Sequence, residues 1–218
     1  QTGLAGYFAY DLCHHLEILP YPGEDDLLFP DLMMGFYDVV IAFDQIQERA
    51  WIMSSGFPET GPAREQRASA RLEEVHTRLA SAPEEPPGPF QPRKALGISA
   101  NFTREAYQQA VQRVVDYIYA GDIFQANISQ RWISKLAPGD APFDLYCRLR
   151  LINEAPFAAY LNYGRTVVAS ASPERFLLLK DHRVETRPIK GTRPRGKDPL
   201  EDRELARDLL ESSKDRAE

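Results

Sequence analysis

Cysteine and histidine are scarce in this sequence, and their spacing excludes several kinds of site. The 218 residues include two cysteines, Cys13 and Cys147, which are too far apart to form a Cys-x-x-Cys metal motif. The four histidines, at positions 14, 15, 76 and 182, do not follow a metal-ligand spacing either. We therefore expect no zinc site and no disulfide framework, and two reduced thiols are typical of a cytoplasmic protein.

Long apolar runs, a basic face and the common nucleotide and hydrolase motifs are also missing. No apolar run is long enough to span a bilayer, and the net charge is -6 with both signs mixed along the chain. Neither a nucleic acid nor a membrane is therefore expected as a partner. No G-x-G-x-x-G, P-loop, H-E-x-x-H or G-x-S-x-G motif occurs. The composition that remains, 43% hydrophobic and 27% charged, predicts a globular protein with a sizeable core.

Prolines divide the chain into parts. Five of the ten residues at positions 83–92 are proline, which is incompatible with a helix or a central strand. We interpret residues 83–97 as a linker between part of an N-terminal sheet region, residues 1–82, and a C-terminal region, residues 98–218. The chain begins without methionine and stops within a predicted helix, so we expect a fragment that is missing both ends.

In the N-terminal part, local patterns predict one hairpin between two helices. A short helix is expected to end near Leu19, where prolines follow. Apolar residues predict a strand over 36–43 that pairs with a strand over 49–53. A polar helix with a narrow apolar stripe is predicted over 62–82.

In the C-terminal part, helices and hairpins are interspersed. Thr103 is a candidate N-cap of a helix that Gly121 ends, and alternating apolar and polar residues predict a strand over 124–129. Further helices are predicted over 143–152 and 199–214, and hairpins over 158–169 and 176–186. The predicted fold class is therefore α+β, with layered, mostly antiparallel sheets and flanking helices.

Lys190 is the first candidate for catalysis. It follows a predicted strand, and Gly191 and Thr192 after it allow a ligand to approach the backbone and meet a hydroxyl group. The same segment contains arginines at positions 187, 193 and 195. A lysine that acts as a nucleophile must have its pKa lowered by about 3 units from about 10.4, or ~4 kcal/mol, and neighbouring cations favour this. A surface turn with solvated basic residues is the alternative.

Glu174 and Glu218 are the candidate acids. The hairpin predicted over 176–186 folds back on itself, so Glu174 and Lys190 are expected at the same end of a sheet, as a general acid and a nucleophile. Glu174 taken alone is equally a surface glutamate. Glu218 lies on a predicted helix, where a solvated helix face is the simpler interpretation.

Five motifs then occur in the order found in a known family. They are an aromatic segment at residues 6–12, AGDIFQANISQR at 120–131, SPERF at 172–176, PIKGT at 188–192 and DRAE at 215–218. Together they resemble the chorismate-utilising enzymes, which include anthranilate synthase, aminodeoxychorismate synthase and their isochorismate- and salicylate-forming relatives. The resemblance covers most of the chain. It implies the fold of that family, with residues 98–218 as the N-terminal part of its chorismate-binding catalytic region.

Lys190 indicates the branch of the family. Anthranilate synthases typically have alanine here, whereas PIKGT is the form of many aminodeoxychorismate synthases, component I. The resemblance implies that the Lys190 amine attacks C2 of chorismate as the 4-hydroxyl leaves, assisted by Glu174, and that ammonia then adds at C4. The expected product is 4-amino-4-deoxychorismate, a precursor of p-aminobenzoate and folate. Anthranilate synthase component I and a non-catalytic, ligand-binding relative are the alternatives.

The resemblance also implies a ligand set. Gly191 and Thr192 are expected to line the ring site, and Glu218 to ligate a Mg²⁺ that holds a substrate carboxylate. Pro156 and Phe157 match positions that line a tryptophan pocket, so tryptophan is a candidate effector. A separate glutamine amidotransferase subunit is expected to supply ammonia. The family's second magnesium glutamate and C-terminal substrate contacts are expected beyond Glu218.

Overall fold

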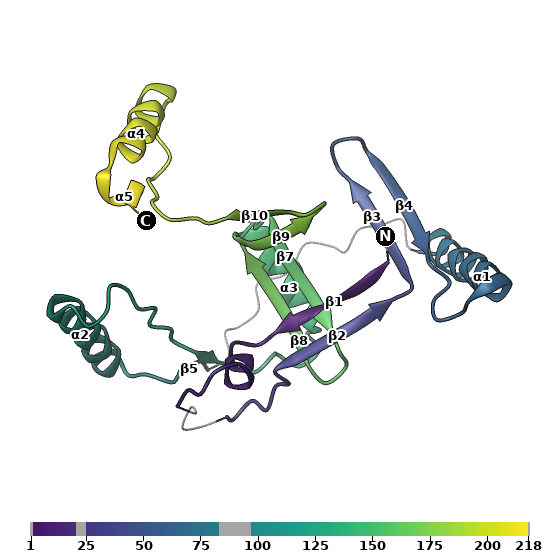
Figure 1. Cartoon of the computed structure of the whole chain (residues 1–218), viewed down its shortest axis with the longest axis horizontal. Helices are drawn as coiled ribbons and strands as arrows, with labels where there is room; N and C mark the ends of the chain where they lie inside the picture. The colour runs from purple at the N-terminus through teal and green to yellow at the C-terminus, as the bar shows by residue number, and fades with distance from the viewer. Residues whose placement is uncertain (1, 21–24, 83–96, 218) are drawn as a thin grey trace. The chain divides into compact units, whose positions relative to one another are not determined.

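The computed structural model describes residues 2–20, 25–82 and 97–217 (Figure 1). The chain divides into two compact units, residues 1–89 and 90–218. The described strands pair in twos, and all five pairings are antiparallel. Helices and antiparallel hairpins therefore make up the described chain, which confirms the predicted α+β class. The predicted linker at 83–97 lies outside the described residues except for Gly97.

The first unit combines two strand pairs with one long helix. Its elements are β1 (Gly3–Phe8), the 3-10 helix η1 (Tyr10–His15), β2 (Leu32–Tyr37), β3 (Val39–Asp44), β4 (Arg49–Ser54) and α1 (Gly61–Ala80). β1 pairs with β2 and β3 with β4, so the predicted hairpin around the turn after Asp44 is confirmed, as is the helix after Pro62. The short helix ends at His15 and not near Leu19, because Leu16 and Glu17 both donate their N–H to the Cys13 carbonyl and close the last turn.

Asp38 interrupts the strand that was predicted over residues 36–43. β2 ends before it and β3 begins after it, so these strands pair with different partners. The Asp38 carboxylate accepts hydrogen bonds from Arg67 at 3.2 Å and Arg71 at 3.0 Å, both on α1, and its carbonyl accepts one from Ser55 N–H at 2.9 Å. A half-buried carboxylate needs such partners, so the chain bends toward the helix at this residue.

The second unit contains the remaining elements. They are β5 (Ser99–Ala100), α2 (Arg104–Ala120), β6 (Trp132–Ile133), α3 (Pro142–Ile152), β7 (Phe157–Asn162), β8 (Val167–Ser172), β9 (Arg175–Lys180), β10 (Arg183–Arg187), α4 (Pro199–Glu211) and α5 (Ser213–Ala217). Both predicted hairpins are present, as β7–β8 and β9–β10. The predicted caps of α2 are confirmed: Thr103 Oγ1 accepts a hydrogen bond from Ala106 N–H at 3.1 Å, and Gly121 ends the helix in the left-handed region at φ 82°.

Two predictions for this unit are wrong. Residues 124–129 do not form a strand, because alternating polarity does not supply the neighbouring strand that backbone hydrogen bonding requires. The helix predicted over 199–214 is two helices, α4 and α5, separated at Ser212. The Ser212 hydroxyl accepts a hydrogen bond from Asp215 N–H at 3.2 Å, so this serine begins a new helix instead of continuing the old one.

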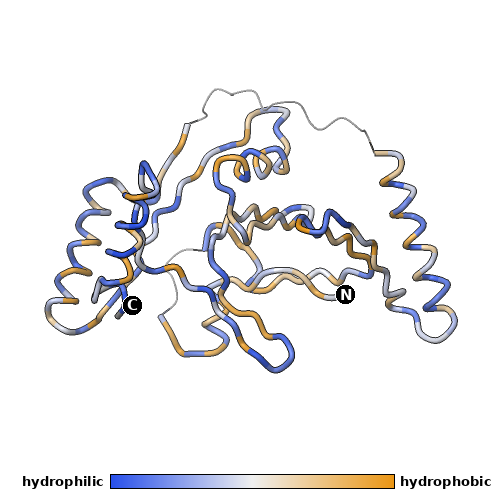
Figure 2. Tube along the Cα trace, turned by 90° about the horizontal axis from the view of Figure 1, so that it is seen from above, coloured by the Kyte–Doolittle hydropathy of each residue, from blue (hydrophilic) through white to orange (hydrophobic). Residues whose placement is uncertain are grey.

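α3 packs on β7 and β8 and forms the most enclosed part of the described chain. Tyr146 is 9% exposed, and its ring centroid lies 5.3 Å from that of Tyr160, which also meets Phe143 at 5.1 Å. Among the described residues Tyr146 is the only buried hydrophobic side chain, so they do not form the predicted sizeable core. Strands paired only in twos leave most of their apolar faces uncovered, and Figure 2 shows hydrophobic and hydrophilic residues interleaved along helices and strands alike. None of the described helices is long and apolar enough to cross a membrane.

Candidate functional site

The β9–β10 hairpin brings Glu174 and Lys190 to the same end of one strand pair. Arg175, the first residue of β9, lies opposite Arg187, the last residue of β10. Glu174 directly precedes Arg175, and Lys190 follows Arg187 by three residues. The predicted return of the chain is therefore present, and both side chains are exposed at the open end of the hairpin.

Ser172 holds the backbone that presents Glu174. Its hydroxyl accepts a hydrogen bond from Glu174 N–H at 3.3 Å and donates one to the Glu174 carbonyl at 3.2 Å. Both bonds are local, so the sharp passage from β8 to β9 is defined by the serine and the proline after it. The Glu174 carboxylate takes no part in these bonds and remains available to a ligand.

Phe157 lies beside this passage. It is the first residue of β7 and pairs in register with Ser172, the last residue of β8. The Arg175 guanidinium stacks over the Phe157 ring at 5.0 Å from its centroid, a distance typical of a cation–π contact. Pro156 is exposed just before it. The two residues predicted to line an effector pocket thus lie next to the strand end that carries Glu174.

Glu185 pairs with two of the arginines at the open end of the hairpin. Its Oε1 accepts a hydrogen bond from Arg187 Nε at 2.6 Å and another from Arg175 Nη1 at 2.6 Å. Arg187, followed by Arg175, lowers the pKa of Glu185, so the carboxylate stays charged. Glu185 and Arg187 are two residues apart, which is the spacing that puts side chains on one face of a strand, and the strand register shifts between them.

Gly191 lies against the side chain of Asp215. A Cβ atom added to Gly191 would come within 2.6 Å of Asp215 Cγ and Oδ1, closer than any side chain tolerates. The absence of a side chain at Gly191 is therefore what lets the PIKGT segment and α5 meet. The structure thereby brings together the fourth and fifth motifs, which are separated by more than twenty residues in the chain.

Arg193 joins the same segment to two helices. Its Nε donates to Asp208 on α4 at 2.6 Å, its Nη2 to Asp215 on α5 at 3.0 Å, and its Nη1 to the Thr192 carbonyl at 3.0 Å. Asp208 and then Asp215 raise the pKa of Arg193 further above its ordinary value. The guanidinium is only 28% exposed, so these bonds are less screened than ordinary surface pairs.

Arg195 is paired as well, which corrects the predicted positive neighbourhood of Lys190. Its guanidinium donates to both carboxylate oxygens of Asp202, at 2.8 and 2.7 Å. The Gly196 N–H and then Arg195 lower the pKa of Asp202. Every arginine that was expected to surround Lys190 thus has a carboxylate partner. Among the residues that the structure describes, none forms a hydrogen bond or ion pair with the Lys190 amine.

A magnesium site is not assembled by the described residues alone. Glu218, the candidate ligand, lies outside them. No group of three or more histidine, cysteine, aspartate or glutamate side chains within the described ranges could hold a metal ion. Mg²⁺ is usually held by one or two carboxylates together with water and substrate oxygens, and the carboxylate of Glu218 suits that chemistry.

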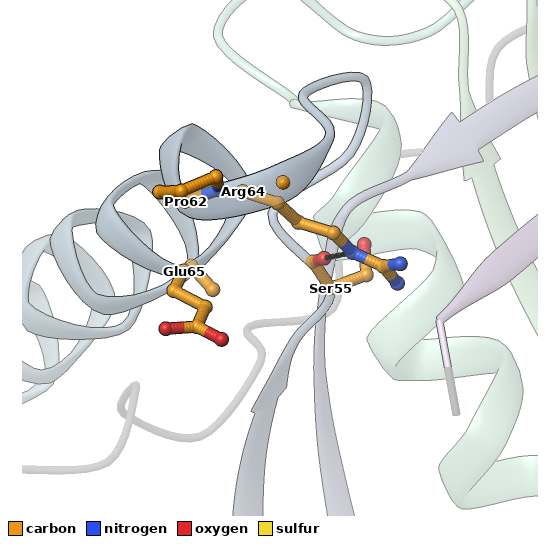
Figure 3. A pocket seen from close by; sticks show the side chains of 6 residues that line it. Ser55, Pro62, Arg64 and Glu65 are labelled. Atoms are coloured by element: carbon orange, nitrogen blue, oxygen red, sulfur yellow. Dashed lines mark hydrogen bonds between the residues drawn. The ribbon is translucent and has the colours of Figure 1, made fainter.

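A separate depression of about 590 Å³ lies in the first unit, between β4 and the start of α1 (Figure 3). It is lined by Ser55, Gly61, Pro62, Arg64, Glu65 and Ala68. Arg64 Nε donates a hydrogen bond to the Ser55 carbonyl at 2.8 Å across it, so the arginine serves to attach the helix. None of the predicted site residues lines this depression.

Sequence reasoning missed the roles of Asp215 and Arg193. The sequence pattern indicates only a positive charge at Arg193, and it indicates only that Asp215 is the first residue of the fifth motif. The spacing of Asp208 and Asp215 was the available signal, because residues seven apart lie on one face of a helix. That signal is weak here, since the helix is broken at Ser212.

Known proteins are similar to this chain over nearly its whole length. Residues 1–218 match the model of a family described as chorismate binding enzyme. Anthranilate synthase component 1 of Thermus thermophilus is 43% identical over 99% of this chain and 45% of its own length. Aminodeoxychorismate synthase component 1 of Escherichia coli is 33% identical over 100% of this chain and 44% of its own length. The crystal structure of anthranilate synthase component I from Streptococcus pneumoniae matches with a TM-score of 0.81 at 26% identity, covering 99% of this chain and 46% of that one. This chain therefore spans about half the length of the relatives that it matches.

Proposed function

The chain belongs to the chorismate binding enzyme family, and from this premise we propose that it carries the nucleophile of a 4-amino-4-deoxychorismate synthase, component I. The observation that supports this proposal is the position of Lys190. Its amine is exposed and has no partner among the described residues, and the hairpin register puts it at the same strand-pair end as Glu174. An alanine at this position could not form a covalent adduct with the substrate.

The proposed reaction has two steps that together leave the lysine unchanged. The Lys190 amine forms a bond to C2 of chorismate, both ring double bonds shift by one position toward C4, and the bond from C4 to its hydroxyl breaks. Glu174 gives a proton to the departing oxygen, which leaves as water. Ammonia then forms a bond to C4, both double bonds shift back, and the bond between C2 and the Lys190 nitrogen breaks. The nitrogen on C4, which begins as an ammonium group, returns one proton to Glu174, so the net change is replacement of the hydroxyl by an amino group with release of water.

The remaining ligands belong to the proposal in the same way. Gly191 and Thr192 contribute backbone and hydroxyl groups next to the nucleophile, and Glu218 is the proposed ligand for Mg²⁺, an ion that would neutralise a substrate carboxylate. We propose a glutamine amidotransferase as the source of ammonia. Tryptophan is the proposed ligand near Pro156 and Phe157, where an aromatic ring already stacks on Arg175.

Anthranilate synthase component I is the second candidate, and a specific observation favours it. The relative from Thermus thermophilus is 43% identical to this chain, whereas the aminodeoxychorismate synthase from Escherichia coli is 33% identical. Overall identity mainly reflects the fold, however, while the reaction depends on the groups in the site. We therefore give Lys190 more weight than the overall identity. A non-catalytic relative is disfavoured by the presence of both Lys190 and Glu174.

The test is a product assay on the whole protein with chorismate, ammonia and Mg²⁺. Wild type is expected to make 4-amino-4-deoxychorismate, and Lys190→Ala is expected to lose this product or shift toward anthranilate. Lys197→Ala, in the same loop, is the matched control and should behave like wild type. Glu174→Gln should slow the reaction by about 10²–10⁴-fold without changing the product. If wild type makes anthranilate and Lys190→Ala changes nothing, the second candidate replaces the first. If wild type converts no chorismate, a non-catalytic relative is the better interpretation.

A further inference from the structure

We infer that Asp215 and Arg193 are positioning residues for the nucleophile, acting through the backbone of Gly191 and Thr192. This inference rests on the proposed function, since it concerns how Lys190 is aimed at the substrate. We call the three residues Gly191, Arg193 and Asp215 the clamp. Neither charged member is proposed to touch the substrate.

The clamp holds the residues on the C-terminal side of Lys190. Gly191 is in contact with the Asp215 carboxylate so closely that a single added carbon atom would collide with it. Arg193 donates to that same carboxylate at 3.0 Å and also to the Thr192 carbonyl at 3.0 Å. Backbone and side-chain contacts therefore converge on one carboxylate, and the peptide that follows Lys190 cannot move without displacing Asp215.

The clamp matters because the Lys190 side chain is not held in any other way within the described part of the chain. Its amine has no hydrogen bond or ion pair there, so within this part of the chain only the backbone fixes the position from which the side chain extends. A nucleophile must lie close to its target atom and in line with it, and a displacement of 1 Å is enough to slow a reaction by about a hundredfold. A held backbone at Gly191 contributes to that alignment by fixing the Cα position from which the amine must reach C2.

The clamp also connects the nucleophile to the fifth motif. Asp215 lies on α5, whose start is defined by the hydrogen bond from Asp215 N–H to the Ser212 hydroxyl at 3.2 Å. Three residues later this motif ends at Glu218, the proposed magnesium ligand. Asp215 therefore belongs to the same motif as the proposed magnesium ligand and contacts the segment that carries the nucleophile.

Asp208 provides a matched control. It accepts the shorter of the two hydrogen bonds from Arg193, at 2.6 Å, but it is 64% exposed, whereas Asp215 is 16% exposed. Only Asp215 also contacts Gly191. If charge pairing with Arg193 were the whole function of these acids, the two should be equivalent. If positioning of Gly191 is the function, they should differ.

The experiment compares Asp215→Ala with Asp208→Ala in the whole protein, measuring kcat, chorismate KM and Tm with ammonia and Mg²⁺. Asp215→Ala is expected to lower kcat by about tenfold to a hundredfold, with KM changed by less than about twofold because an aligning contact acts mainly in the transition state. Asp208→Ala is expected to lower kcat by no more than about fivefold, as for an exposed pair. Asp215→Asn keeps the shape and one acceptor oxygen, so it should recover most of the lost kcat.

Several results would overturn the clamp. One is an equal loss of kcat in the two alanine variants; another is a loss in Asp215→Ala that follows its Tm and is not recovered by asparagine. Should Asp215→Ala fail to fold, Arg193→Lys decides, because the three acceptors are bound by three different guanidinium nitrogens and the single nitrogen of lysine cannot reach all three positions. That variant must then lose kcat with Tm retained. The outcome is separable from the proposed function: if Lys190→Ala abolishes the product but Asp215 and Asp208 prove equivalent, the nucleophile stands and the clamp fails.

Discussion

The two units of this chain use arginine and carboxylate groups in opposite arrangements. In the first unit one acid, Asp38, accepts hydrogen bonds from two arginines of a single helix, Arg67 and Arg71. In the second unit one arginine, Arg193, donates to two acids on two helices, Asp208 and Asp215. The first arrangement attaches a helix to the start of a strand, and the second attaches a loop to two helices.

The difference shows that arginine–carboxylate pairs can stabilise the fold or position the site, depending on which elements they hold together. Asp38 is 17% exposed, and its partners hold α1, which carries no candidate site residue. The Arg193 group holds the three residues directly after the proposed nucleophile. Loss of the first group should therefore appear mainly as lost stability, and loss of the second mainly as lost activity.

The largest effect is expected on the turnover rate, from Gly191→Ala, and it tests whether the Arg193 group serves the site. The new Cβ would collide with the Asp215 side chain, so the loop or that side chain must shift, and we expect the turnover rate to fall by about a hundredfold. Gly97→Ala is the control, because no atom lies within 4 Å of a Cβ added there. Steady-state kinetics on the two variants measures the effect. Full activity in Gly191→Ala would mean that the contact with Asp215 is not needed.

The next largest effect is on stability, from Asp38→Ala. Removing this acceptor leaves two arginines without their shared partner, and we expect the free energy of unfolding to fall by about 1–2 kcal/mol. Activity of the protein that remains folded should be preserved. Glu74→Ala, which removes another acid that pairs with Arg71, should cost less because Glu74 is more exposed. Urea unfolding measures both, and an equal cost would contradict the central role of Asp38.

The stabilisation from Asp38 is expected to depend on acid pH. The hydrogen bond from Arg71 is the main cause that holds the pKa of Asp38 below its ordinary value of 3.8. A depressed pKa in the folded state means that the stabilisation is complete above the unfolded value and is lost as pH falls through the folded value. The difference in unfolding free energy between wild type and Asp38→Asn should therefore be constant near neutral pH and shrink below pH 3.8. A difference that persists unchanged into strong acid would exclude this carboxylate as its source.

The smallest effect is expected from Arg195→Ala. Arg195 is 89% exposed, and its partner Asp202 keeps the Gly196 N–H at 2.9 Å when the guanidinium is removed. Exposed pairs contribute little to stability, so Tm should not change measurably. Thermal unfolding of this variant beside Arg193→Ala separates the two arginines. A large loss in Arg195→Ala would show that the loop is held at more than one point.

Local signals in the sequence predicted much of the secondary structure. Thr103 and Gly121 marked the ends of α2 because capping depends on neighbouring residues only. The β9–β10 hairpin was predictable from two apolar runs around a short turn. Two predictions failed where distant residues matter: residues 124–129 have the pattern of a strand but no strand beside them, and the predicted strand over 36–43 is interrupted at Asp38, which binds two arginines of α1.

Two features can be recognised from the sequence alone. One is the set of family motifs, and the other is the β-hairpin that puts Glu174 and Lys190 at one end of a strand pair. Both follow from residue identity, periodicity and turn chemistry, which act over a few residues. Which carboxylate each arginine binds is known only from the three-dimensional structure, and so is the finding that the arginines of the Lys190 segment are all paired. The structure also decided that Gly191 meets Asp215. Charged groups choose their partners by distance in space, and a chain with 26 basic and 32 acidic residues allows far too many pairings for spacing alone to select one.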